Sequence, residues 1–150
     1  NGSGDRIVFI SDCHGSPDVW IMNSDGTERK PLYKGAGEEH DPLFLSGDDT
    51  VAFISVSEET EGESPGRFSL LSVDVDGKDV QNLMPEKYRY KQLFMAHLER
   101  LAPHNYVYFQ GRFLDDGRRS PYVVLTVDLE KQKVRQMAIR GVDILDPVLR

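Results

Sequence analysis

The sequence predicts an all-β protein in which one unit of about 50 residues occurs three times. Each unit contains a short apolar strand, at residues 7–10, 51–54 and 106–109. A Ser-Pro pair follows in each unit, and the prolines lie 48 and then 56 residues apart (17 to 65, 65 to 121). Asp-Gly turns recur 51 residues apart, at Gly26 and Gly77. Four short strands per unit at this spacing are typical of β-propeller blades, so we expect three blades of four antiparallel strands per chain.

The first unit, about residues 5–40, shows the layout most clearly. Its strands are expected at residues 7–10, 18–22 and 28–32. Pro17 stands at a strand entrance, where the missing N–H of proline is tolerated. Asp25-Gly26 fits a hairpin, because glycine supplies the positive φ that such turns require.

The second and third units, about residues 41–90 and 91–142, each have one more strand in front. The expected strands of the second unit are 41–45, 51–54, 68–73 and 79–83; those of the third are 92–95, 106–109, 122–127 and 133–138. Residues 143–150 are predicted to be the first strand of a further blade, because Asp146-Pro147-Val148-Leu149 repeats the pattern of Asp41-Pro42-Leu43-Phe44. Leu93–Leu101 is the best candidate for a helix, although nine residues are short for one.

Three blades are fewer than a closed propeller needs. Rings close with about four to eight blades, and closure protects the edge strands. Two chains could form one six-bladed ring in which the C-terminal strand of each completes the first blade of the other. Alternatively, the chain is a piece of a longer propeller. A small β-sheet domain of another kind is the third alternative.

Composition excludes several classes of function. The chain of 150 residues has 25 acidic and 18 basic residues and a formal net charge of −7, which argues against sequence-independent nucleic-acid binding and against binding to anionic membranes. No apolar run is long enough for a membrane span, and Asn1–Asp5 do not resemble a signal peptide, although one could have been removed. The single cysteine, Cys13, excludes an internal disulfide and a multi-cysteine zinc site. We expect no cofactor.

The first unit resembles the TolB-like, WD40-like β-propeller repeat. The matching residues are Ser11-Asp12, Gly15, Asp18 to Asn23, Asp25-Gly26, Arg29 and Leu32, followed by Pro42, Phe44 and Ser46 to Asp48. The second unit keeps Asp74, Asp76-Gly77 and Leu83, whereas the third keeps Asp128 and lacks the turn glycine. The resemblance implies four-stranded blades around a central channel and suggests an exported, periplasmic bacterial protein. It does not imply a chemistry, since fold does not fix function.

The predicted topology gathers polar loops on one rim of the blades. The acidic loop with Glu58, Glu59, Glu61 and Glu63 lies there, and so do the binding candidates Tyr88, Arg89, Tyr90, Arg112, Asp115, Arg118 and Arg119. Loops on one face of a rigid scaffold are where binding residues usually lie, and alternating Tyr and Arg resembles the composition of interface hot spots. The alternative is that these charged loops are simply solvated.

Metal-binding and catalytic signals are weak. His14 and His40 are expected on that same rim, where Asp12 and Asp41 could join them as metal ligands, whereas His97 and His104 belong to a connection on the opposite rim. We assign neither a metal site nor a catalytic residue.

Three local patterns have structural readings that we favour over catalytic ones. Cys13 and His14 are adjacent, and neighbouring residues of an extended segment point apart. Asp48-Asp49 and Asp115-Asp116 are better read as turn residues than as acid/base pairs. The recurring Asp18, Asp25, Asp74 and Asp128 are expected to hold turns rather than calcium.

The sequence therefore favours a non-enzymatic β-propeller scaffold that binds a protein or peptide partner through its rim loops. Two alternatives remain. The chain could be the propeller part of a hydrolase or lyase, of the peptidase or glycan-degrading type, whose catalytic residues lie elsewhere or at a metal. It could also be a purely structural unit for ring assembly.

Overall fold

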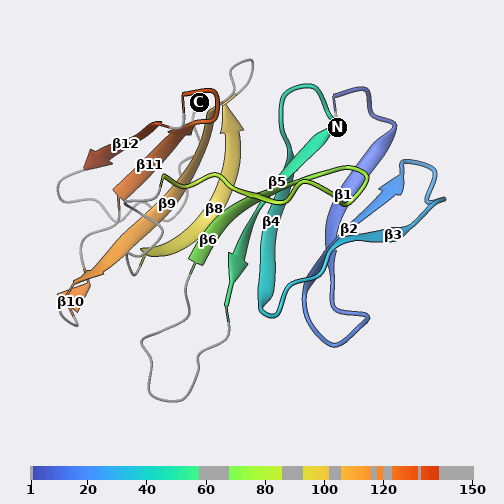
Figure 1. Ribbon diagram of the computed structural model, residues 1–150, viewed down its shortest axis with the longest axis horizontal. Coiled ribbons are helices and arrows are strands. Elements are labelled where there is room, and N and C mark those ends of the chain that lie inside the picture. The colour runs from blue at the N-terminus through green and yellow to red at the C-terminus, as the bar shows by residue number, and fades with distance from the viewer. Residues whose placement is uncertain are drawn as a thin grey trace.

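The computed structural model describes residues 2–57, 68–85, 93–101, 106–115, 118–119, 123–131 and 133–138, and it consists of three antiparallel sheets (Figure 1). Within these residues every regular element is a strand, which confirms the all-β prediction. No described segment is a helix of the length and hydrophobicity that crossing a membrane requires.

The first sheet has the order β1 (Arg6–Ser11), β2 (Asp18–Asn23) and β3 (Lys30–Tyr33). The turn between β2 and β3 forms as predicted from Asp25-Gly26. Gly26 has φ 84°, and the Asp25 carboxylate accepts hydrogen bonds from the Thr27 backbone N–H (2.9 Å) and hydroxyl (2.6 Å). These two bonds lower the pKa of Asp25.

The second sheet has the order β4 (Glu38–Phe44), β5 (Thr50–Val56), β6 (Phe68–Asp74) and β7 (Gln81–Asn82). β4 begins three residues earlier than the predicted strand at residue 41. Its pairing with β5 is irregular between His40 and Leu43, next to Asp41, whose φ of 50° is left-handed. This irregularity is a β-bulge, which shifts the alternation of side chains along the strand.

The third sheet contains β8 (Leu93–Leu101), β9 (Tyr106–Asp115), β10 (Arg118–Arg119), β11 (Val123–Asp128) and β12 (Lys133–Ala138). Its order is β10-β9-β11-β12, and β8 also pairs with β9. The strand expected at residues 92–95 is present and continues to Leu101, so the segment that was the best candidate for a helix is a strand. The expectation that His97 lies in a connection is wrong, because His97 lies inside this strand. Pairing with β9 along the whole segment decides this, because tertiary context overrides a weak helical pattern.

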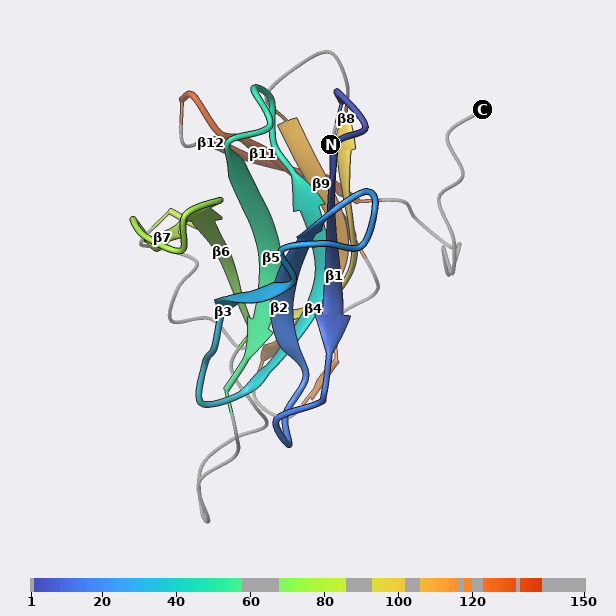
Figure 2. The ribbon, with the colours of Figure 1, turned by 90° about the vertical axis from the view of Figure 1, so that its right-hand side faces the viewer.

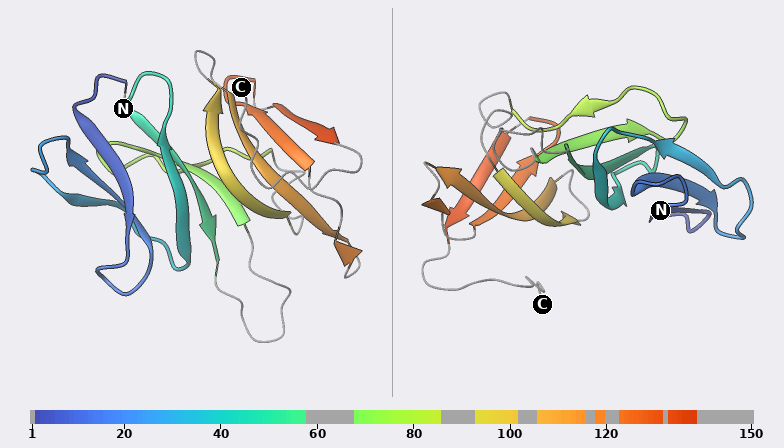
Figure 3. Two further views of the ribbon diagram at one scale, coloured as in Figure 1. Left: turned by 180° about the vertical axis from the view of Figure 1, so that it is seen from behind. Right: turned by 90° about the horizontal axis from the view of Figure 1, so that it is seen from below.

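The three sheets pack face to face, and the second sheet lies in the middle. Alternate residues of β5 point to opposite sides: Val51 and Phe53 join the core shared with the first sheet, whereas Ala52 and Ile54 join the core shared with the third. All four are at most 1% exposed. The views from behind and from below show the same order of sheets (Figure 3).

Corresponding strands of the three sheets lie on the same side of the molecule. β1 lies against β4 and β4 against β8, whereas β3, β7 and β12 lie toward the opposite side (Figure 2). This is the arrangement of blades around an axis, with β1, β4 and β8 innermost. The sheets do not close into a ring within the described residues, and no strand among those residues pairs with the inner edge of β1.

Candidate functional site

The antiparallel strands sort the connections into two rims. We call the sheet-linking rim the end of the sheets where β1, β3, β5, β7 and β9 end and where β2, β4, β6, β8 and β11 begin; its described connections are residues 12–17, 34–37 and 83–85. The hairpin rim is the opposite end, with the described residues 2–5, 24–29, 45–49, 75–80 and 129–131. The sheet-linking rim is where the sequence places the binding candidates, and it is the candidate functional site.

Part of this rim is described only in its backbone. Tyr88, Arg89 and Tyr90 lie outside the described residues, as do Asp116 and the segment with Glu58, Glu59, Glu61 and Glu63. His104, which the sequence assigns to the opposite rim, also lies outside them. Arg112 and Asp115 belong to β9, and Arg118 and Arg119 form β10. The β9–β10 hairpin therefore brings four of the seven binding candidates into one two-stranded element.

The β9–β10 hairpin continues beyond the described part of β11, while Arg112 and Phe113 still pair with Phe94 and Leu93 of β8. β9 pairs with β11 only as far as Gly111, so its last four residues, 112–115, continue beyond β11. β10 pairs with this extension and sets Arg118 opposite Asp115 and Arg119 opposite Leu114. The sheet thus supports an arm at the rim on which basic and acidic residues occupy directly opposed backbone positions.

Cys13 and His14 form a contact that the sequence analysis did not expect. The Cys13 Sγ lies 3.2 Å from His14 Nδ1, and the His14 ring stacks on Trp20 with centroids 5.2 Å apart. The expectation that the two side chains point apart is wrong, because residues 12–15 form a turn: the Gly15 N–H donates to the Asp12 carbonyl (2.8 Å), and Gly15 has φ 104°. Both residues of the pair are exposed.

His40 pairs with an acidic neighbour rather than with His14. Its Nε2 lies 3.8 Å from a carboxylate oxygen of Glu38. Among the described residues, no group of three or more His, Cys, Asp and Glu side chains converges on a point that could hold a metal ion.

A buried carboxylate, Glu39, lies beneath the rim at the junction of the first and second sheets. The side chain is fully buried, and its backbone N–H donates to the Pro17 carbonyl (2.8 Å), which ties β4 to the entrance of β2. Glu39 Oε1 accepts a hydrogen bond from the Ser55 hydroxyl (3.2 Å), whereas Oε2 has no hydrogen-bond partner among the described residues. Gly35 packs closely against this carboxylate, because a β-carbon at Gly35 would overlap Glu39 Oε1.

Burial decides the ionisation of Glu39. Desolvation is the main cause that raises the pKa of Glu39, and the negative charge of Asp18 adds to it, while hydrogen bonds from Ser55 and Gly35 act in the opposite direction. Asp18 is itself only 2% exposed. Burial and the charge of Glu39 also raise the pKa of the Tyr33 hydroxyl. With no exposed surface, Glu39 can hold a proton at the junction of two sheets but cannot meet a substrate.

Sequence reasoning missed Glu39 because its burial depends on the bulge. Simple alternation from Phe44, which packs between the first two sheets, would point Glu39 to the other side of β4. The extra residue at Asp41 reverses this and brings Glu39 to the face of Ser55 and Asp18. A glutamate two residues before the Asp-Pro-Leu-Phe segment carries no signal of this by itself.

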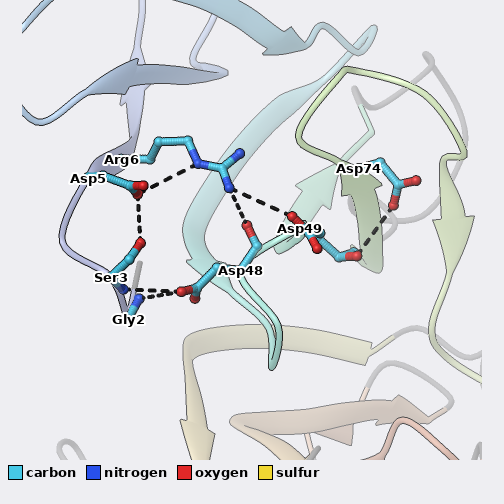
Figure 4. A network of polar contacts seen from close by, with 8 residues as sticks. Gly2, Ser3, Asp5, Arg6, Asp48, Asp49 and Asp74 are labelled. Carbon is cyan, nitrogen blue, oxygen red and sulfur yellow. Dashed lines mark hydrogen bonds and ion pairs between the residues drawn. The ribbon is translucent and has the colours of Figure 1, made fainter.

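The hairpin rim is built from aspartates that bind backbone and neighbouring side chains (Figure 4). Asp48 accepts hydrogen bonds from the N–H groups of Gly2 (2.8 Å) and Ser3 (3.3 Å), which lower its pKa, and Asp49 lies 3.7 Å from the Arg6 guanidinium. Asp128 accepts from the backbone N–H groups of Glu130 (3.2 Å) and Lys131 (3.0 Å). Asp25, Asp48 and Asp128 therefore stabilise turns and the contacts between them. Asp74 accepts a hydrogen bond from the Thr50 hydroxyl (3.3 Å), and Asp18 accepts one from the Ser16 hydroxyl (3.4 Å).

Comparison with known proteins identifies the fold and not the family. No family model matches the chain, and no curated protein sequence is similar to it. Among solved structures, a TolB-type protein of Agrobacterium tumefaciens matches with a TM-score of 0.66 and 16% identity, over 89% of this chain and 45% of that one. A chain in the crystal structure of a nidogen/laminin complex matches with a TM-score of 0.51 and 13% identity, over 91% of this chain and 60% of that one. The chain thus spans about half the length of the structures it resembles, and its fold is that of a β-propeller-like scaffold.

Proposed function

We propose that the chain is a non-enzymatic propeller module that binds a protein or peptide partner through the sheet-linking rim. The β9–β10 hairpin is the observation on which this proposal rests. Residues 112–115 of β9 continue beyond the described part of β11, and Arg112, Asp115, Arg118 and Arg119 all belong to this hairpin. Interfaces are enriched in arginine, and binding residues concentrate on elements that a rigid scaffold positions.

The remaining candidates, Tyr88, Arg89 and Tyr90, lie between β7 and β8 in the sequence, and we include them in the proposed surface. One structural neighbour occurs in a complex of two proteins, nidogen and laminin, which is consistent with a binding role for such scaffolds. An exported, periplasmic location, which the TolB-like resemblance implies, belongs to the same proposal.

Charge reversal of the hairpin tests the proposal. Peptides would be selected from a random library on the unmodified protein, and their affinities would be measured by fluorescence anisotropy for Arg118→Glu/Arg119→Glu. The control is Lys133→Glu/Arg135→Glu on β12, which makes the same change in net charge at two exposed positions. We expect at least a tenfold loss of affinity for the hairpin variant and less than a twofold loss for the control. Equal affinities for the two variants would show that the hairpin is not part of the binding surface.

A further inference from the structure

The junction between the first and second sheets is held by different contacts at its two ends. At the hairpin rim, the Asp48 carboxylate accepts hydrogen bonds from the N–H groups of Gly2 and Ser3, which precede β1 (Figure 4). These hydrogen bonds lower the pKa of Asp48, so this end is held by a carboxylate that is ionised at neutral pH. At the sheet-linking rim, the acidic side chain at the junction is Glu39, which is buried. The two ends therefore respond to pH in different ways.

Glu39 is a buried carboxyl group without a cationic partner among the described residues. Its Oε2 atom has no hydrogen-bond partner among those residues either. The described polar groups that act on Glu39 come from four neighbouring segments: Asp18 of β2, Tyr33 of β3, Ser55 of β5 and the Gly35 N–H. β1 and β8 also pack against β4, but their cations Arg6 and Arg100 contact the hairpin-rim end, at Asp48 and Phe44. Burial of an unpaired carboxylate is costly, and a proton removes that cost.

Water can reach the Glu39 carboxyl group only if the sheet-linking end of the junction opens. The Glu39 N–H donates to the Pro17 carbonyl (2.8 Å), which holds β4 against the segment that leads into β2. Residues 34–37 lie directly against the carboxyl group, because a β-carbon at Gly35 would overlap Oε1. Hydration of Glu39 therefore requires β4 to separate from the segments that cover it, and this separation breaks the hydrogen bond between Glu39 and Pro17.

We propose that the proton on Glu39 controls this end of the junction: the end is closed when Glu39 is protonated, and it opens locally when Glu39 is ionised. The protonated group is uncharged and can stay buried, whereas the carboxylate, next to the negative charge of Asp18, is stabilised by water in the open form. Burial raises the pKa of Glu39, so the closed form is most favoured below the ordinary value of 4.5, and opening becomes more frequent as the pH rises through the raised value. This inference does not depend on the hairpin surface proposed above.

Hydrogen exchange of the Glu39 amide, followed by NMR, measures this opening directly. Its protection factor, which is corrected for the intrinsic pH dependence of exchange, should fall at least fivefold between pH 4 and pH 8. In Glu39→Gln, whose side chain is neutral at every pH, the protection of residue 39 should change less than twofold. Constant protection in the unmodified protein would overturn the proposal. An equal fall in Glu39→Gln would also overturn it, because another group, such as a histidine, would then carry the proton.

Dilute urea distinguishes a local opening from unfolding of the whole chain. Phe53 lies in the central β5, is fully buried, and should exchange its amide hydrogen only when the sheets unfold. At pH 8, about 1 M urea should lower the protection of the Phe53 amide at least fivefold and that of the Glu39 amide less than twofold, because a local opening exposes little surface. The same urea dependence for both amides would show that Glu39 is exposed only by global unfolding, and would contradict the proposal.

Two neighbours of Glu39 should shift the midpoint of this pH dependence in opposite directions, which tests the proposal even if Glu39→Gln does not fold. Ser55→Ala removes a hydrogen bond that favours the carboxylate, so the midpoint should move to higher pH. Asp18→Asn removes a negative charge that disfavours the carboxylate, so the midpoint should move to lower pH. His40→Gln, next in sequence but paired with Glu38, is the control and should leave the midpoint unchanged. Shifts of the same sign in the first two variants, or a shift in the control, would overturn the assignment to Glu39.

Discussion

The first and second sheets have the same sequence layout but different degrees of burial. Residues 7–10 and 51–54 are strands of similar composition, and each pairs with the strand that follows it. β5 is buried because it has β4 at its edge and a sheet on each face, whereas β1 has a packed sheet on one face only and no strand at its edge among the described residues. The difference teaches that position in the array, rather than the sequence of the unit, sets how much each strand stabilises the fold.

The largest expected effect tests this comparison directly. Phe53 is 0% exposed and packs against Tyr33, with ring centroids 4.8 Å apart, whereas Phe9, its counterpart in β1, is half-buried. Phe53→Ala should lower the free energy of unfolding by about 3–5 kcal/mol, because it leaves a cavity between two sheets. Phe9→Ala should cost roughly 1 kcal/mol, because less apolar area is removed from water. Urea denaturation measures both, and equal losses would contradict the comparison.

The next prediction concerns the link between the two sheets. A β-carbon on Gly37 would overlap the carbonyl oxygen of Val56, at the point where the chain enters β4. Gly37→Ala should therefore destabilise the protein by about 1–3 kcal/mol, as overpacking does where backbone cannot yield. Gly15→Ala, where a β-carbon meets open space but φ is 104°, is the comparison: it should cost only the strain of a left-handed alanine, about 1–2 kcal/mol. Thermal unfolding of the two variants would show whether the loss of stability from the overlap at Gly37 is larger than the loss from the left-handed backbone at Gly15.

A third prediction uses the carboxylate that joins the sheets. The pKa of Glu39 is raised in the folded protein, so its contribution to stability is fully present below the unfolded pKa near 4.5 and is lost as the pH rises through the folded pKa. Glu39→Gln should remove this decline and make the protein more stable than the unmodified chain at pH 7, by about 1 kcal/mol.

The exposed Glu28 supplies the matched control for Glu39. Glu28→Gln removes one carboxylate from the surface, so it controls for the change in net charge without touching the junction of the two sheets. The measurement is the free energy of unfolding in urea between pH 4 and pH 8 for the three proteins. If Glu39→Gln keeps the slope of the unmodified chain, Glu39 is ionised at the junction without cost, and the inference from its burial fails.

Features that depend on local sequence patterns could be predicted, whereas features that depend on packing between distant segments could not. Asp25-Gly26 and Asp76-Gly77 predict their hairpins, because in each turn the aspartate accepts a backbone hydrogen bond and the glycine adopts the positive φ. The strand expected at residues 92–95 was predicted too short, because the conformation of residues 96–101 depends on β9, a partner later in the chain. Glu39 was missed because a bulge reverses the alternation on which the prediction of burial depends.

The rim could be predicted only as a set of loops. Antiparallel order assigns each connection to one of two ends, so the sequence was enough to place Arg112, Asp115, Arg118 and Arg119 together. The pairing of Asp115 with Arg118 across a hairpin is a matter of register, and register depends on turn length and on neighbouring strands. The contact of Cys13 with His14 likewise follows from a turn closed at Gly15, which the expectation of an extended segment did not include.

The smallest expected effect lies on the hairpin rim, where Arg6 at the start of β1 connects the first sheet to the second. Its guanidinium donates to the Asp48 carbonyl (3.2 Å) and lies 3.7 Å from Asp49 (Figure 4). Because Asp49 is largely exposed, Arg6→Ala should cost only about 0.5–1 kcal/mol, and less in 0.5 M NaCl, where exposed ion pairs are screened. Arg29→Ala, at an exposed position before β3, should change stability by a few tenths of a kcal/mol at either salt concentration. A loss at Arg6 that does not respond to salt would mean that the hydrogen bond to the Asp48 carbonyl, and not the ion pair, joins β1 to the second sheet at this rim.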